Sequence, residues 1–78
     1  MTRPHSAPRS LVICVRNTGY AASLEKRKVY VVIPDSVAAK HDQIRVIDES
    51  GEDYLYPESF FVLVTLPQSI RKAILAAA

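Results

Sequence analysis

Ahead of the alanine-rich C-terminal segment, most apolar residues in this chain fall into five short runs, separated by polar segments that contain glycine, proline, aspartate or asparagine. Most of the apolar runs are rich in β-branched or aromatic residues and are too short for helices, which favours strands. The predicted strands span residues 11–15, 29–33, 44–47, 54–56 and 60–66. The first run is continuously apolar, so we expect it to be buried on both faces. The pattern therefore predicts a mainly β chain.

The connections between these runs differ in length and character. Residues 16–28 form a long excursion with a turn signal at residues 17–19 and no strand period. After the second run, Asp35 is placed to cap a short helical turn, since its carboxylate can accept from free backbone amides. The polar stretch 48–53 contains Gly51, which can adopt a positive φ, and predicts a tight hairpin between the third and fourth strands.

The two ends of the chain are predicted to behave differently. Residues 1–9 hold two prolines and no apolar period, and we expect a disordered N-terminal tail. Pro67 stands at the favoured first position of a terminal helix over residues 67–78, in which Ile70 and Ile74 share one face. Such a short helix is marginal alone, so it must pack on the strands.

The order of these elements resembles that of an SH3-like barrel. In that fold a long excursion follows the first strand, a tight hairpin joins the third and fourth, and a one-turn 3₁₀ element with the pattern Pro-x-x-aromatic precedes the last strand. Here Pro57-Glu58-Ser59-Phe60 matches this pattern, and residues 19–25, 28–30 and 45–57 are similar to those of small uncharacterised bacterial SH3-like proteins. The resemblance implies a small five-stranded SH3-like barrel over residues 10–66, with the terminal helix packed on it.

Charge is distributed unevenly along the 78 residues, although the net charge is only +2. Residues 1–42 carry seven Lys and Arg against three Asp and Glu, residues 43–66 carry one against five, and the last twelve residues add two cations. The chain therefore combines a basic excursion with an acidic hairpin. This favours a polarised interaction module over a strongly basic nucleic-acid binder.

Candidate catalytic chemistry is weak throughout. Cys14 lies inside an apolar run and is expected to be a buried thiol with a raised pKa, not a nucleophile served by His41 and Asp42. The acidic stretch 48–53 is expected to be a solvated turn, with a cation site there as the less favoured alternative. The two glycines are too far apart for a phosphate-binding loop. We therefore expect a protein that is not an enzyme and has no metal or cofactor.

The aromatic residues offer a candidate contact surface. Tyr54 and Tyr56 share one face of a predicted strand, opposite Leu55. If Leu55 is buried, both tyrosines are exposed and form a patch for a partner protein. Alternatively, they cover the sheet and pack against the excursion that carries Tyr20. The predicted partner-binding residues are Tyr20, Tyr54, Tyr56, Pro57 and Phe60. The chain has no tryptophan, which argues against binding of proline-rich peptides.

A second possible function is nucleic-acid binding by the excursion. Its basic residues could follow a phosphate backbone while tyrosines stack on bases. The candidate residues are Arg16, Lys26, Arg27 and Lys28. We refer to these four as the basic patch.

Cysteine content and hydropathy bear on location. A single cysteine cannot form an internal disulfide, which favours the reducing cytoplasm. The apolar run at residues 11–15 is too short for a signal peptide or a membrane span, so no membrane partner is expected. Self-association through an exposed edge strand or the alanine-rich helix stays open.

Overall fold

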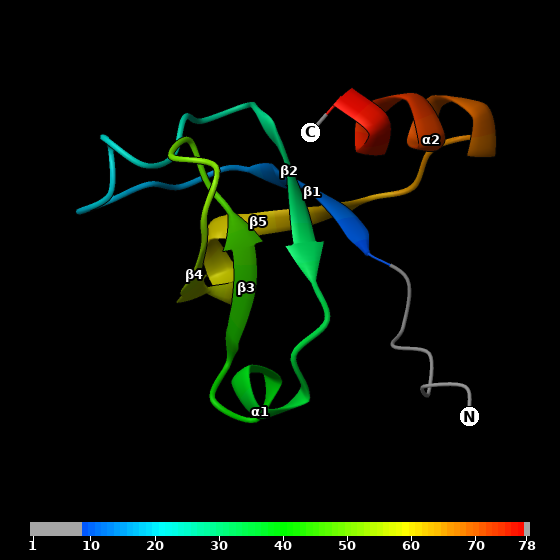
Figure 1. Ribbon diagram of the computed structural model, residues 1–78. Coiled ribbons are helices and arrows are strands. Elements are labelled where there is room, and N and C mark those ends of the chain that lie inside the picture. Colours follow the sequence, from blue (N-terminus) through cyan, green and yellow to red (C-terminus); the bar gives the residue numbers. More distant parts are fainter. Residues whose placement is uncertain (1–8, 78) are drawn as a thin grey trace.

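The protein is built on a single antiparallel sheet of five strands (Figure 1). The computed structural model describes residues 9–77. Its elements are β1 (Ser10–Cys14), β2 (Val29–Ile33), α1 (Ser36–Ala39), β3 (Gln43–Ile47), β4 (Asp53–Pro57), the 3₁₀ turn η1 (Glu58–Phe60), β5 (Phe61–Val64) and α2 (Gln68–Ala77). The five strands lie in the order β4-β3-β2-β1-β5. The prediction of a mainly β chain with a C-terminal helix is confirmed, while most of the predicted tail lies outside the described residues.

Two of these elements, α1 and the β3–β4 hairpin, follow from local signals in the sequence. Asp35 caps α1 through Oδ1, which accepts from the backbone N–H groups of Val37 and Ala38 at 3.1 and 2.9 Å. The β3–β4 hairpin is paired from Gln43 opposite Pro57 to Ile47 opposite Asp53, and Gly51 in its turn has a φ of 85°. Both features are as predicted from the sequence.

The segment before the last strand differs in one respect from the prediction. The Pro57-Glu58-Ser59-Phe60 sequence does form a 3₁₀ turn, η1. Phe60 belongs to this turn and not to the fifth strand, which begins at Phe61 and ends at Val64. The backbone of Phe60 is turned back toward β1, because its carbonyl accepts from the N–H groups of Val15 and Arg16 at 2.8 and 3.2 Å.

The core lies on one face of the sheet and is closed by the excursion. Its buried members are Val12, Cys14, Leu24, Tyr30, Val46, Tyr56 and Phe60. Leu24 is completely buried although it belongs to no strand or helix, so the excursion forms one wall of the core. Cys14 is also completely buried, and its burial raises the pKa of the thiol.

The other face of the sheet is apolar as well, and α2 lies over it. Leu11 and Val31 are opposite each other in the β1–β2 register and are buried on this second face. Ile74 and Ala77 of α2 line a hollow together with Val31. In Figure 1, α2 lies at the side of the molecule away from the excursion. No helix of residues 9–77 is long and apolar enough to span a membrane.

Candidate functional site

The structure divides the predicted partner-binding residues into an exposed and a buried group. Tyr20 and Tyr54 are 43% and 49% exposed, whereas Tyr56 and Phe60 are 3% and 7% exposed. Pro57 is half-buried. The prediction that Tyr56 and Phe60 lie on a contact surface is therefore wrong: both belong to the core.

The physical reason is the position of the excursion over β4. Leu55 is 39% exposed, so it is not the buried residue of β4, and the tyrosine face points inward instead. Tyr20 packs edge-to-face on Tyr56, with ring centroids 5.0 Å apart, and approaches Phe60 at 5.9 Å. For Tyr56 the alternative expectation, packing against the excursion at Tyr20, is the arrangement found. Tyr54 stays exposed nearer the hairpin turn.

A groove of about 430 Å³ lies between the excursion and the β3–β4 hairpin. Its lining residues are Tyr20, Ser23, Asp48, Ser50, Tyr54, Leu55 and Tyr56. We refer to it as the tyrosine groove. Tyr20 and Tyr54 are its exposed aromatic residues, and the buried Tyr56 and Asp48 lie at its base.

Asp48, like Tyr56, is a member of this groove that the sequence pattern places on the surface. The pattern predicts a solvated turn for residues 48–53, yet Asp48 is only 7% exposed. Its Oδ1 accepts from the backbone N–H and the hydroxyl of Ser50 at 2.8 and 2.6 Å, and its Oδ2 accepts from the Tyr56 hydroxyl at 2.6 Å. An Asp whose side chain bonds to the backbone two residues further on is a common turn feature, but nothing in that feature indicates burial.

Hydrogen bonds set the charge state of this pair. Burial by itself would raise the pKa of Asp48, but the bonds from Ser50 and Tyr56 outweigh it and hold the pKa below its ordinary value. Burial, together with the hydrogen bond to Asp48, raises the pKa of Tyr56 to about 12. At neutral pH Asp48 is therefore an anion and Tyr56 a neutral donor.

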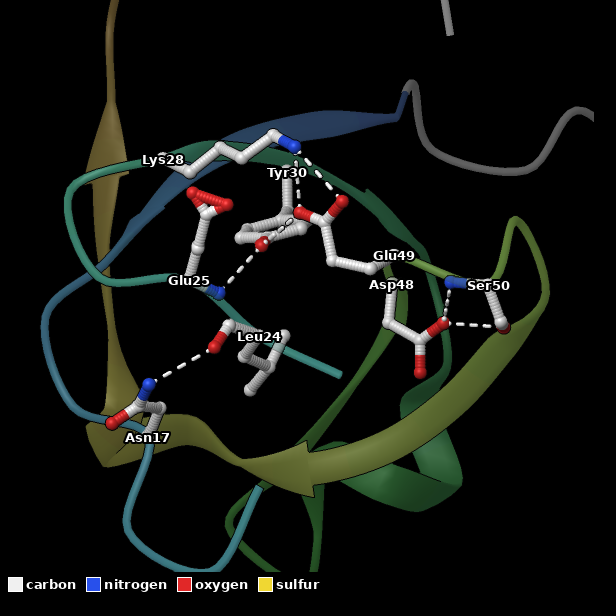
Figure 2. A network of polar contacts seen from close by, with 8 residues as sticks. All are labelled: Asn17, Leu24, Glu25, Lys28, Tyr30, Asp48, Glu49 and Ser50. Carbon is white, nitrogen blue, oxygen red and sulfur yellow. Dashed lines mark hydrogen bonds and ion pairs between the residues drawn. The ribbon is translucent and has the colours of Figure 1, made fainter. Parts of the chain in front are cut away.

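A second set of polar contacts positions the excursion beside the groove (Figure 2). The Tyr30 hydroxyl accepts from the backbone N–H of Glu25 at 2.7 Å and donates to the carboxylate of Glu49. Lys28 Nζ lies 2.7 Å from one oxygen of that carboxylate, and the backbone N–H of Glu49 donates to the carbonyl of Ser23 at 3.1 Å. Glu49 thus joins the excursion to the hairpin.

The four residues of the basic patch differ in whether they form ion pairs. Lys28 is paired with Glu49, whereas the ion pairs found in the described part of the chain do not include Arg16, Lys26 or Arg27. Lys26 and Arg27 line a separate hollow of about 510 Å³ beside β1. Arg27 has a φ of 70°, a left-handed conformation that is uncommon for a residue other than glycine.

Most carboxylates of the acidic hairpin already have hydrogen-bond or ion-pair partners within the protein. Besides Asp48 and Glu49, Asp53 accepts from Arg45 at 3.0 Å, and Arg45 also reaches Asp35 at 2.9 Å. Within residues 9–77, no three His, Cys, Asp or Glu side chains converge as a metal site would require.

Comparison with known proteins gave no match to any protein-family model, curated protein or solved structure. The tyrosine groove and the residues that form it are therefore the main indication of function.

Proposed function

We propose that this protein is a non-catalytic interaction module, built on an SH3-like barrel, that binds a partner protein in the tyrosine groove. Three features support the SH3-like assignment: the strand order β4-β3-β2-β1-β5, the long excursion between β1 and β2, and the 3₁₀ turn before β5. The buried free Cys14 fits a reducing compartment such as the cytoplasm.

The observation that carries the proposal is the pair of exposed tyrosines on the groove. The Tyr20 ring is held by its edge-to-face contact with Tyr56, and the Tyr54 hydroxyl donates to Glu52 at 3.1 Å. Both rings are therefore positioned before a partner arrives. Ordered aromatic side chains provide a large contact area at a low entropic cost, which is why they dominate many protein interfaces.

The charge states in the groove support binding more than catalysis. A general acid or base works best when its pKa lies near the working pH. The pKa of Asp48 is held below its ordinary value, and that of Tyr56 is raised to about 12. Neither group is set to exchange a proton near neutrality.

The test is a comparison of three immobilised proteins: the wild type, Tyr54→Ala and the control Val62→Ala. Val62 is 55% exposed, similar to Tyr54, but it lies on β5 and does not line the groove. Loss of an interface aromatic weakens binding by about 2 kcal/mol or more, roughly 30-fold. We expect quantitative mass spectrometry to find proteins that the wild type and Val62→Ala capture and Tyr54→Ala does not. Identical capture by all three proteins would contradict the proposal.

A second candidate function, nucleic-acid binding, is favoured by the exposed basic residues that are not in ion pairs. Arg16, Lys26 and Arg27 are all exposed, and Lys26 and Arg27 line the hollow at β1. Fluorescence anisotropy with labelled single-stranded RNA and DNA tests this function. If the protein binds nucleic acid through these residues, binding weakens steeply with added salt and is reduced in a Lys26→Ala/Arg27→Ala variant. Failure to bind at tens of micromolar in low salt would remove it.

A further inference from the structure

Within residues 9–77, Asp48 differs from the other buried or paired carboxylates because it forms no ion pair. Asp35 and Asp53 contact Arg45, and Glu49 contacts Lys28. Asp48 is more buried than these, but its hydrogen bonds come only from the neutral donors Ser50 and Tyr56. An ionised carboxylate loses much of its solvation when it is buried, and a nearby positive charge normally compensates for that loss.

The surroundings of Asp48 leave room for such a charge on one side. Asp48 lines the tyrosine groove, and no lysine or arginine is among the residues that form this groove. Lys28, which lines a second hollow together with Asp48, is paired with Glu49, and Arg45 is paired with Asp35 and Asp53. On the groove side, the negative charge of Asp48 is therefore open to a cation supplied by a partner.

The tyrosines of the groove suit a cation as well. The face of a phenol ring carries negative electrostatic potential and attracts ammonium and guanidinium groups. Tyr20 and Tyr54 expose their rings to the groove, and Tyr54 also holds the carboxylate of Glu52 beside it. The groove volume of about 430 Å³ lies within the usual range of ligand pockets and accommodates a long side chain.

We propose that the tyrosine groove receives the positively charged end of a lysine or arginine side chain of the partner protein. The cation lies against the rings of Tyr20 and Tyr54 and compensates the buried charge of Asp48. This inference rests on the proposed function, and it adds the chemistry of the partner: an exposed basic residue, not an acidic or purely apolar segment.

The test is an NMR titration of the ¹⁵N-labelled protein with three small probes. These are the N-acetyl amides of arginine, lysine and glutamine; glutamine serves as the neutral control. We expect saturable shifts at the backbone amides of Ser23, Ser50 and Tyr54 with the two cationic probes, and at least about tenfold weaker binding of the glutamine probe. Equal binding of charged and neutral probes, or no binding of any probe, would overturn the cation proposal.

Variants separate the contributions of charge and ring. Tyr54→Leu keeps an apolar side chain but removes the π face, so we expect at least fivefold weaker binding of the arginine probe, whereas Tyr54→Phe should retain binding. Asp48→Asn removes the buried charge and should weaken the cationic probes about tenfold without affecting the neutral one. If Asp48→Asn does not fold, the Tyr54→Leu and Tyr54→Phe pair decides the question: equal binding by the two overturns the proposal.

The capture experiment keeps this inference distinguishable from the proposed function. Proteins lost with Tyr54→Ala, combined with probes that bind without regard to charge, would retain the groove as the binding site and exclude cation recognition. Shifts of the same residues by calcium chloride at equal concentration would show a general cation site and would also overturn a side-chain ligand.

Discussion

Two segments cover the sheet, one on each face, and they are held in different ways. The excursion has no strand or helix, yet it contributes the completely buried Leu24 and is joined to the hairpin through Glu49 and Tyr30 (Figure 2). By contrast, α2 is a regular ten-residue helix in which no residue is fully buried. Regular secondary structure is therefore not what fixes a segment in this protein. Buried side chains and hydrogen bonds to other segments do so.

The difference follows from where each segment finds partners for its backbone. Most of the N–H and carbonyl groups of a helix are satisfied within the helix, so α2 needs no hydrogen bonds to the sheet. The excursion has only a few bonds within itself, such as the one from the Asn17 side chain to the carbonyl of Leu24 at 2.9 Å. It adds bonds to other segments: the N–H of Arg27 donates to the carbonyl of Cys14 at 2.7 Å, and the N–H of Glu25 donates to the Tyr30 hydroxyl. These bonds orient the excursion over the core and form one side of the tyrosine groove.

The largest effect is expected from Leu24→Ala. Removing a completely buried leucine deletes apolar contacts and leaves a cavity, which should reduce the free energy of unfolding by about 3 kcal/mol. Urea denaturation followed by circular dichroism measures this change. A loss below about 1 kcal/mol would show that the excursion is not a wall of the core and would remove the contrast with α2.

Tyr56→Phe should come next. The substitution keeps the buried ring but removes the hydroxyl that donates to Asp48 at 2.6 Å, leaving a buried carboxylate oxygen without its donor. We expect a loss of about 2 kcal/mol in urea denaturation. Tyr54→Phe is the matched control, because it removes a hydroxyl from an exposed tyrosine of the same strand and should change stability little. Equal effects of the two variants would contradict the role given to Asp48.

Alkaline pH should lower the free energy of unfolding, because two buried tyrosines that contact the excursion or the hairpin then lose their protons. The pKa of Tyr56 is raised from 10.0 to about 12, and the pKa of Tyr30 is also raised, chiefly by burial and then by Glu49. A folded-state pKa above the unfolded value gives stability that is complete below about pH 10 and is lost as the pH rises toward 12. For Tyr56 the loss is on the order of 2 kcal/mol.

The measurement is urea denaturation at several pH values between 8 and 12, with phenolate formation followed by absorbance. Tyr56→Phe should show a shallower decline than the wild type over this range. An identical decline in both proteins would assign the pH dependence to other groups.

The smallest effect is expected in α2. Ile74 is only half-buried, so Ile74→Ala should cost less than about 1 kcal/mol in the same urea experiment. In hydrogen exchange of the wild type, the amides of α2 should exchange well before that of Leu24, which is bonded to the carbonyl of Tyr20 at 2.9 Å. If the amides of α2 were as protected from exchange as those of the core strands, the conclusion that α2 is held less firmly than the excursion would be wrong.

The positions of the strands and turns could be predicted from the sequence because the signals are local. Alternation and β-branched residues located the five strands, Gly51 marked the hairpin turn, and Asp35 marked the cap of α1. The Pro57-to-Phe60 sequence correctly indicated a 3₁₀ turn. The boundaries of the last strand differ from the prediction: β5 is shorter than the apolar run at residues 60–66, and Phe60 lies outside the strand.

The candidate site could be predicted only in part. The sequence predicts Tyr20 and Tyr54 as exposed contact residues, and both are exposed and line the groove. It misplaced Tyr56 and Phe60 on the surface and left Asp48 in solvent, although all three are buried. A period of two shows that Tyr54 and Tyr56 share a face, but it does not show which face of β4 the excursion covers, or how far along the strand.

By itself the sequence determined the mainly β architecture, the hairpin and its turn, and the absence of any strong catalytic motif, since these depend on neighbouring residues and composition. Only the tertiary structure decided that the excursion closes the core, that α2 lies over the second apolar face, and that Asp48 is buried at the base of the tyrosine groove, where it forms no ion pair with any described residue. Burial depends on contacts between segments far apart in the chain, and no local pattern encodes those contacts. The sequence thus located the tyrosines, and the packing of the excursion decided which of them are exposed and which are buried.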